Sequence, residues 1–425
     1  MTLDRTIPPK VSPFSDIKLP EEKVEILANG IVFHYVDVGE QPISRLGVYW
    51  EGGFLDYPDK ASAAVLAEAF REQTANYSSD SIADIIDYNG ARLSSRAAEH
   101  YTALELVALN SRLPDLLPLI ASMATESVFD EHHVGVIARK LGAARAVQLS
   151  KVAFRAAVEM RRLVQGKSHP ASKLVLPQDY ENVTPETLAS LYADQKQARM
   201  HVFLGGALGE KTVNTVRNFL HTLPGGDMKP LKIEPYLPEP LTGDSLHIEM
   251  PQSQQSAVVM GLPTIDRSNP DYIALRLAVT ALGGYFGSRL MHNIREEKGL
   301  TYGISAALLG SREGAFMEIN AQCDASGVEQ LIEESIKEIR LLVSNPPAGD
   351  ELHRLRQFAW SQLAASADSS FGILDHYITH LLVATPDDYF SAQLDAIDTL
   401  SPKRIAEVAE KYLNPDNLRI VTCGR

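Results

Sequence analysis

The sequence predicts an α+β protein made of two homologous halves, each with a mainly antiparallel sheet and helices packed on one face. Strand-like runs are interleaved with long helical patterns, without the regular βαβ spacing of a parallel sheet. Parts of the first half recur in the second at an offset of about 220 residues. The chain has 425 residues, 45% of them hydrophobic, which is more than one hydrophobic core usually serves.

The internal repeat depends on two pairs of segments. Thr184–Gly206 and Ser401–Gly424 each begin with a Ser or Thr N-cap, continue with Pro at the first helical position, and end in a β-rich run that closes on Gly. Before them, Phe129–Gly166 and Gly349–Ala384 each show a long helical pattern that opens on Asp-Glu. Both pairs have nearly the same offset, as expected of a duplicated α/β unit.

The strands are expected at matching places in the two halves. Leu46–Trp50 and Leu104–Leu109 are strand-like in the first half, and Ser256–Met260 and Ala315–Gln322 are their counterparts in the second.

The composition of residues 223–245 predicts a linker, because this segment is rich in Pro and Gly and lacks helical periodicity. We therefore expect an N-terminal extension over residues 1–23, an N-terminal α+β domain over 24–222 and a C-terminal α+β domain over 246–425.

Charge and hydropathy exclude several classes of partner. The net charge is -14, the sequence pI is about 5.4, and no run of Lys and Arg exceeds two residues, so a nucleic-acid partner is not expected. No stretch reaches the roughly 20 apolar residues that span a bilayer, and the N-terminus has no apolar signal region. We expect no membrane partner and a cytoplasmic location. Cys323 and Cys423 are interpreted as small buried residues.

Two histidine pairs are weak candidates for a metal site. His376 and His380 are four apart in a probable helix and could share a metal, but no acid follows at a suitable distance. His132 and His133 are adjacent at a helix start, where side chains diverge by about 100°. We expect no metal at either pair.

The segment Leu282–Ala306, with the sequence LGGYFGSRLMHNIREEKGLTYGISA, carries the most specific motif. Its glycine pair (Gly283, Gly284), its Ser-Arg-Leu run (Ser288, Arg289) and its R-E-x-x-G-L-x-Y pattern resemble the signature of the pitrilysin, insulinase and mitochondrial processing peptidase family. In that family, an Arg and a Tyr spaced like Arg295 and Tyr302 are directed from a C-terminal half toward the scissile bond.

The chemistry of peptide hydrolysis explains why such a pair is useful. When zinc-bound water attacks an amide, negative charge develops on the carbonyl oxygen, and a nearby phenol can donate a hydrogen bond to it. A guanidinium can hold substrate carbonyls or orient the phenol. The alternative interpretation is structural: Arg295 would form a surface ion pair with Glu296 or Glu297, and Tyr302 would begin a strand and pack in a core.

The zinc motif of this family, H-x-x-E-H, is degenerate in the chain. Aligned on GGFLDYPDKASAAVLAEAFREQT, the two His positions hold Val65 and Ala69, and only Glu68 is kept. The resemblance places the third ligand, a Glu, near Arg145, and residues 132–158 contain no Asp or Glu. Catalytic zinc needs three protein ligands, so no metal is expected in this chain. Glu68 is interpreted as a solvated or hydrogen-bonded remnant.

The resemblance also implies a segment that binds extended peptide. Asn89–Leu93 and the alternating run after it correspond to the sheet edge on which the family's catalytic subunits bind peptide, although an ordinary sheet strand is the favoured interpretation.

The resemblance implies a role in a two-subunit peptidase. We expect a non-catalytic complementing subunit that supplies Arg295 and Tyr302 to a homologous zinc-binding partner, for the cleavage of unfolded peptides. Zinc is then expected in the partner, and this chain is expected to be inactive without it. The alternative is a peptide-binding or structural member without catalysis. An independent enzyme is disfavoured because no nucleophile triad, phosphate loop or metal cluster is present in the sequence.

Overall fold

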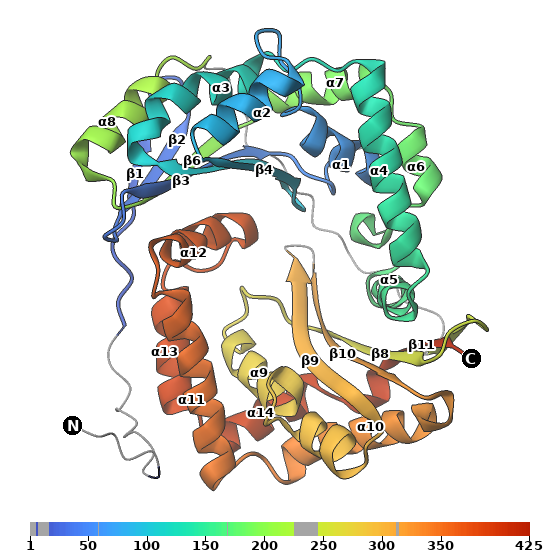
Figure 1. The fold of residues 1–425 in the computed structure, drawn as a ribbon. Helices are drawn as coiled ribbons and strands as arrows, with labels where there is room; N and C mark the ends of the chain where they lie inside the picture. The colour runs from blue at the N-terminus through green and yellow to red at the C-terminus, as the bar shows by residue number, and fades with distance from the viewer. Residues whose placement is uncertain (1–5, 7–16, 58, 168, 225–244, 312–313) are drawn as a thin grey trace.

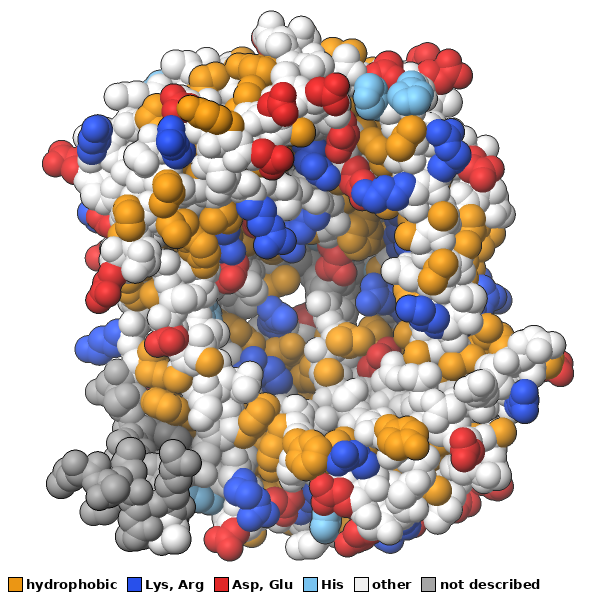
Figure 2. Space-filling model, viewed as in Figure 1, with side chains coloured by type: hydrophobic (Ala, Val, Ile, Leu, Met, Phe, Trp, Pro, Cys, Tyr) orange, Lys and Arg blue, Asp and Glu red, His pale blue; other side chains and the backbone are white. Residues whose placement is uncertain are grey.

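Two sheets, each with its own helices, face each other across a central hollow (Figures 1 and 2). The structure is a computed structural model that describes residue 6 and residues 17–57, 59–167, 169–224, 245–311 and 314–425. The predicted linker and N-terminal extension lie largely outside the described residues. Among the described helices, none is long and apolar enough to cross a membrane.

The first half is built on a six-stranded sheet of order β1-β2-β6-β3-β5-β4. Its strands are β1 (Lys23–Ile26), β2 (Val32–Asp37), β3 (Ile43–Glu51), β4 (Arg92–Ala97), β5 (Tyr101–Leu109) and β6 (Met200–Gly206). All neighbouring pairs are antiparallel except β2 with β6.

The second half repeats this arrangement in a five-stranded sheet of order β7-β11-β8-β10-β9. Its strands are β7 (Ser245–Glu249), β8 (Ser256–Thr264), β9 (Thr301–Ser311), β10 (Gly314–Cys323) and β11 (Arg419–Gly424). Each strand of this sheet has a counterpart in the first sheet, where only β1 is left unmatched. The parallel pair β7–β11 corresponds to the parallel pair β2–β6. The prediction of two homologous α+β halves with mainly antiparallel sheets is confirmed.

Most helices cover the outer face of the sheet of their own half (Figure 1). Those of the first half are α1 (Lys60–Ala69), α2 (Ser79–Tyr88), α3 (Leu113–Thr125), α4 (Glu131–Leu149), α5 (Val152–Gln165), α6 (Pro177–Glu181), α7 (Pro185–Gln195) and α8 (Gly209–Leu220). Those of the second half are α9 (Tyr272–Val279), α10 (Val328–Ser344), α11 (Gly349–Ser366), α12 (Ser370–Val383), α13 (Tyr389–Thr399) and α14 (Pro402–Tyr412).

The repeated capping signal has the same geometry in both halves. The Thr184 hydroxyl accepts a hydrogen bond from the N–H of Thr187 at the start of α7, and the Ser401 hydroxyl accepts one from the N–H of Arg404 at the start of α14. Each satisfies a helix donor that would otherwise lack a partner, and Pro occupies the first turn in both.

Each long helical pattern is two helices rather than one. The first breaks at Ser150 and Lys151 into α4 and α5, and the second breaks after Ser366 into α11 and α12. The break lets the second helix of each pair leave its own half. Thus α5 packs on the sheet of the second half, and α12 packs on the sheet of the first half.

We call α5 and α12 the exchanged helices, because each packs on the sheet of the opposite half. Each places a buried side chain close to a glycine of that sheet. Met160 of α5 lies against Gly261 of β8, where an added Cβ would come within 2.3 Å of the Met160 sulfur. Leu374 of α12 lies against Gly205 of β6, where a Cβ would come within 2.9 Å of a Leu374 methyl carbon. The absent glycine side chains therefore make room for each exchanged helix.

Candidate functional site

Arg295 lies in a π-helical turn, η4 (Met291–Glu297), directly before β9. Its Nε donates a hydrogen bond to the carbonyl oxygen of Tyr302 at 3.1 Å, and its guanidinium carbon lies 4.8 Å from the centre of the Phe286 ring. Its Nη1 is 3.9 Å from a carboxylate oxygen of Glu296. The predicted pair is therefore brought together, but Arg295 contacts the backbone of Tyr302 and not its phenol. π-Helical turns are rare and often occur at functional sites.

Tyr302 lies at a β-bulge. β9 is the edge strand of its sheet, and its register with β10 shifts between Ala321 and Cys323, so Tyr302 and Gly303 together oppose Gln322. A bulge re-aims the side chain that it carries. The Tyr302 side chain is 91% exposed, so the interpretation that it packs in a core is wrong.

The neighbouring threonine holds the bulge in shape. The Thr301 hydroxyl donates to the carbonyl oxygen of Gln322 at 2.6 Å and accepts from the N–H of Gly303 at 3.1 Å. A groove of about 520 Å³ runs beside Tyr302, and Met291 and Asn320 contribute to its lining. The exposed Tyr302 therefore lines a groove that extends from β9 across to β10.

The other residues of the motif act as supports in the structure. Gly283 is required by close approach, since a Cβ there would come within 2.6 Å of the backbone nitrogen of Ala306 in β9. Ser288 is buried. Arg289 forms two parallel hydrogen bonds to the carboxylate of Glu351, at 2.7 and 2.9 Å, and so ties this loop to α11.

Gly284 and Gly299 shape the two ends of the same loop. A Cβ on Gly284 would come within 3.0 Å of the Thr280 side chain. Gly299 has a φ of +63°, in the left-handed region that favours glycine, and it forms the turn between Arg295 and Tyr302. Gly284 therefore avoids crowding the Thr280 side chain, and Gly299 permits the left-handed turn.

The degenerate zinc motif lies on α1. Val65 and Ala69 are buried in the core of the first half and have no lone-pair donor in their side chains. A carboxylate oxygen of Glu68 is paired with the Lys140 ammonium of α4 at 2.8 Å. Glu68 is therefore held in an ion pair between α1 and α4.

The position expected for the third ligand also holds a cation. Arg145 of α4 donates to the Tyr180 hydroxyl at 3.3 Å, and its guanidinium carbon lies 5.4 Å from the centre of the Phe154 ring. Two aliphatic side chains and a guanidinium do not fit Zn²⁺, which needs nitrogen, sulfur or carboxylate ligands. Among the described residues, no three His, Cys, Asp or Glu side chains are grouped so as to hold a metal.

The other histidines have separate partners. His376 Nε2 lies 2.9 Å from the Ser366 hydroxyl, and burial lowers the pKa of His376. His380 Nδ1 lies 3.1 Å from the Thr385 hydroxyl. The two rings therefore do not face a common site. Cys323 and Cys423 are both buried free thiols.

The predicted peptide-binding edge is shorter than expected. β4 is the edge strand of the first sheet, whereas β5, which forms from the alternating run, lies inside the sheet between β3 and β4. The correction follows from the hydrophobic alternation of β5, which fits a paired strand with one buried face as well as it fits an edge.

Metal analysis of the isolated chain provides a first test. Because Val65 and Ala69 cannot ligate zinc and Arg145 repels it, we expect the purified, dialysed chain to contain less than about 0.1 equivalent of zinc by elemental analysis. One equivalent of zinc, together with peptidase activity that a chelator removes, would contradict this prediction.

Comparisons with known proteins agree with the geometry. Residues 182–358, which include Arg295 and Tyr302, match the family described as the peptidase M16 inactive domain. The chain is 20% identical over 323 residues to the uncharacterized zinc protease YmxG of Bacillus subtilis, covering 72% of this chain and 74% of that protein. It is 26% identical over 170 residues to an uncharacterized zinc protease of Streptomyces coelicolor, covering 40% of this chain but only 34% of the relative.

A solved structure shows the same fold over nearly the whole chain. The peptidase M16 inactive domain from Pseudomonas fluorescens superposes with a TM-score of 0.84 at 22% sequence identity, covering 95% of this chain and 98% of that one. The match to the inactive domain, the zinc protease relatives and this shared fold all agree with the resemblance seen in the sequence. The chain therefore has the fold of the pitrilysin- and insulinase-like peptidases, and its residues 182–358 match their inactive domain.

Proposed function

We propose that the chain is the non-catalytic complementing subunit of a heterodimeric zinc peptidase. It presents Arg295 and Tyr302 to the active site of a homologous partner that carries H-x-x-E-H, and the pair cleaves unfolded peptides. The partner's zinc supplies the attacking water. The match to the family's inactive domain supports the non-catalytic part of this proposal.

The exposure of Tyr302 is the observation that carries the proposal. A tyrosine that served only packing would bury most of its ring, whereas this one is 91% exposed. Phe286, beneath the Arg295 guanidinium, is also 64% exposed. Bulky aromatic side chains held in water by a bulge and a π-helical turn are available to a second molecule.

The geometry assigns different tasks to the two residues. The free phenol of Tyr302 can donate a hydrogen bond to the scissile carbonyl oxygen as it gains negative charge. Arg295 holds the backbone of Tyr302 through Nε. Its remaining guanidinium nitrogens can bind carbonyl groups of a peptide lying along the groove beside β9.

Reconstitution tests this function. A homologous subunit with an intact H-x-x-E-H motif, taken from the same genome, should form a heterodimer with this chain. We expect each subunit alone to leave an unfolded peptide intact and the mixture to cleave it, which can be followed by size-exclusion chromatography and by mass spectrometry of the products. A partner that is fully active alone, and unaffected by this chain, would favour the structural or peptide-binding alternative.

A further inference from the structure

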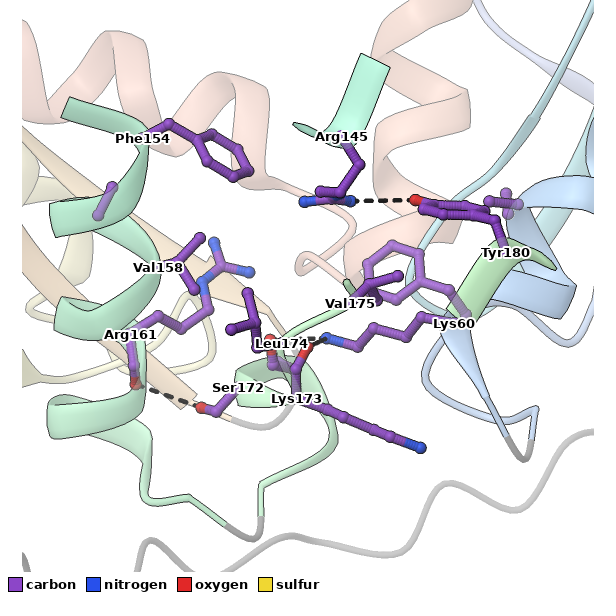
Figure 3. Close-up of a pocket in the computed structure, with 15 residues that line it drawn as sticks. Lys60, Arg145, Phe154, Val158, Arg161, Ser172, Lys173, Leu174, Val175 and Tyr180 are labelled. Carbon is purple, nitrogen blue, oxygen red and sulfur yellow. Dashed lines mark hydrogen bonds between the residues drawn. The ribbon is translucent and has the colours of Figure 1, made fainter. Parts of the chain in front are cut away.

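A pocket of about 380 Å³ lies beside the degenerate zinc motif (Figure 3). Its wall is formed by α1, α4, α5 and α6 together with residues 171–175, which connect α5 to α6. Ala64, immediately before Val65 of the motif, lines it. The volume is within the range of pockets that bind small ligands, although the pocket contains no site for a metal.

Three cationic side chains from three helices line this pocket: Lys60 of α1, Arg145 of α4 and Arg161 of α5. The Lys60 ammonium donates to the carbonyl oxygen of Ala171 at 2.7 Å. The Arg145 guanidinium donates to the Tyr180 hydroxyl, and its buried Nε has no hydrogen-bond partner. Among the described residues, none of the three cations forms an ion pair with a carboxylate, although the charge of Glu99 acts on Lys60 and that of Arg161 acts on Glu318.

The cations repel one another. Burial, followed by the positive charges of Arg161 and Arg145, lowers the pKa of Lys60 to about 8, and the charge of Glu99 opposes this shift. The Lys173 side chain, by contrast, points away from the centre of the pocket in Figure 3. In a protein with a net charge of -14, like charges grouped in this way around a cavity indicate a site for an anion.

Most of the remaining wall is apolar. Phe54 and Phe154 contribute aromatic rings, and Val158 and Leu174 contribute aliphatic side chains. Figure 3 shows Val158 and Leu174 close to the Arg161 guanidinium. A ligand that fits both parts must carry an anionic group and an apolar group next to each other.

We propose that this pocket binds the C-terminal carboxylate of a peptide whose last residue is apolar. A terminal residue carries its carboxylate and its side chain on one Cα, so one residue satisfies both the cations and the apolar wall. An internal Glu or Asp side chain offers the carboxylate alone, and inorganic phosphate leaves the apolar wall unused. The pocket itself indicates a ligand with a carboxylate beside an apolar group. That this ligand is a peptide rests on the proposed function.

The test measures binding to the isolated, full-length chain. The probe is a fluorescently labelled octapeptide ending in Leu, made with either a free C-terminal carboxylate or a C-terminal amide. We expect the free acid to bind at least about tenfold more tightly in fluorescence anisotropy, because hydrogen bonds to charged groups are the strong ones. Arg145→Gln and Arg161→Gln should each weaken binding of the acid by about tenfold and leave binding of the amide unchanged.

Two further variants separate the pocket from general charge and folding effects. Arg139→Gln removes an exposed charge from the same helix as Arg145 and should leave binding unchanged. Ala157→Trp fills the pocket from α5 without changing charge and should abolish binding. Circular dichroism of each variant shows whether it is folded.

Several outcomes would overturn the proposal. Equal binding of acid and amide, or no binding of the acid at millimolar peptide, would exclude the carboxylate site. An amidated peptide with an internal Glu that binds as tightly as the free acid would overturn the assignment to the terminal carboxylate. Direct binding of inorganic phosphate, measured by calorimetry, without any binding of the peptide would overturn the choice of a peptide ligand. The binding assay contains no partner subunit, so it is independent of the reconstitution experiment. Loss of peptide binding and failure to form an active heterodimer can therefore be told apart.

Discussion

Tyr302→Phe is expected to lower the kcat of the reconstituted heterodimer by about 10²- to 10³-fold. Removing one preorganised donor to a developing oxyanion has a cost of this size, and the change deletes only the hydroxyl. Because the ring is almost fully exposed, subunit folding should be unaffected. Steady-state kinetics on an unfolded peptide measures the effect, with thermal unfolding and size-exclusion chromatography as checks on fold and assembly.

Matched variants show whether the effect is specific to the Tyr302 hydroxyl or follows the removal of any exposed tyrosine hydroxyl. Tyr88 is 82% exposed on α2, so Tyr88→Phe makes the same chemical change at a comparable exposure and should leave kcat unchanged. Glu68→Gln should also have little effect, because Glu68 pairs with Lys140 and lies on a helix without zinc ligands. Full activity of Tyr302→Phe together with loss of activity in Glu68→Gln would show that the roles of the two subunits are reversed.

Met160→Ala and Leu374→Ala are each expected to destabilise the protein by about 2–5 kcal/mol, the usual cost of removing a large side chain from a packed core. Both side chains are fully buried, and each fills the interface between one exchanged helix and the sheet of the opposite half. Guanidinium unfolding, followed by circular dichroism, gives the change in free energy of unfolding.

The comparison variant for these two is Val147→Ala. Val147 lies on α4 and is 59% exposed, so its truncation should change the free energy of unfolding by less than about 0.5 kcal/mol. If Met160→Ala and Leu374→Ala change stability no more than Val147→Ala does, the two helices do not hold the halves together.

Local signals explain why the two-half fold could be predicted. The caps at Thr184 and Ser401 act within one turn of helix, so a matching pattern of Ser or Thr followed by Pro is sufficient to mark both helix starts. The exchange of α5 and α12 could not be predicted in this way. A buried face such as that of Met160 has the same sequence pattern whichever sheet it contacts, and only tertiary structure decides between them.

In the candidate site, too, local features could be predicted from the sequence and features that depend on tertiary structure could not. The family resemblance predicted that Arg295 and Tyr302 form a pair, and the structure brings them together around Gly299, whose φ is +63°. The sequence did not predict the bulge at Tyr302, which depends on the register of β9 against a strand formed by residues 314–323. The loss of zinc ligands could be seen from Val65 and Ala69, but the pocket of cations beside them is assembled by three separate helices and has no contiguous motif.

The exchange of helices also affects how the protein folds as it is synthesised. The inner face of the first sheet carries Tyr49, Tyr101 and Phe203, and its cover is α12, from residues 370–383. Roughly 160 residues separate the last strand of this sheet from α12, which is about 10–30 s of translation at about 5–20 residues per second. During that interval an aromatic surface is complete but uncovered. The nascent first half is therefore exposed to aggregation during synthesis, and its final packing must wait until α12 has been made.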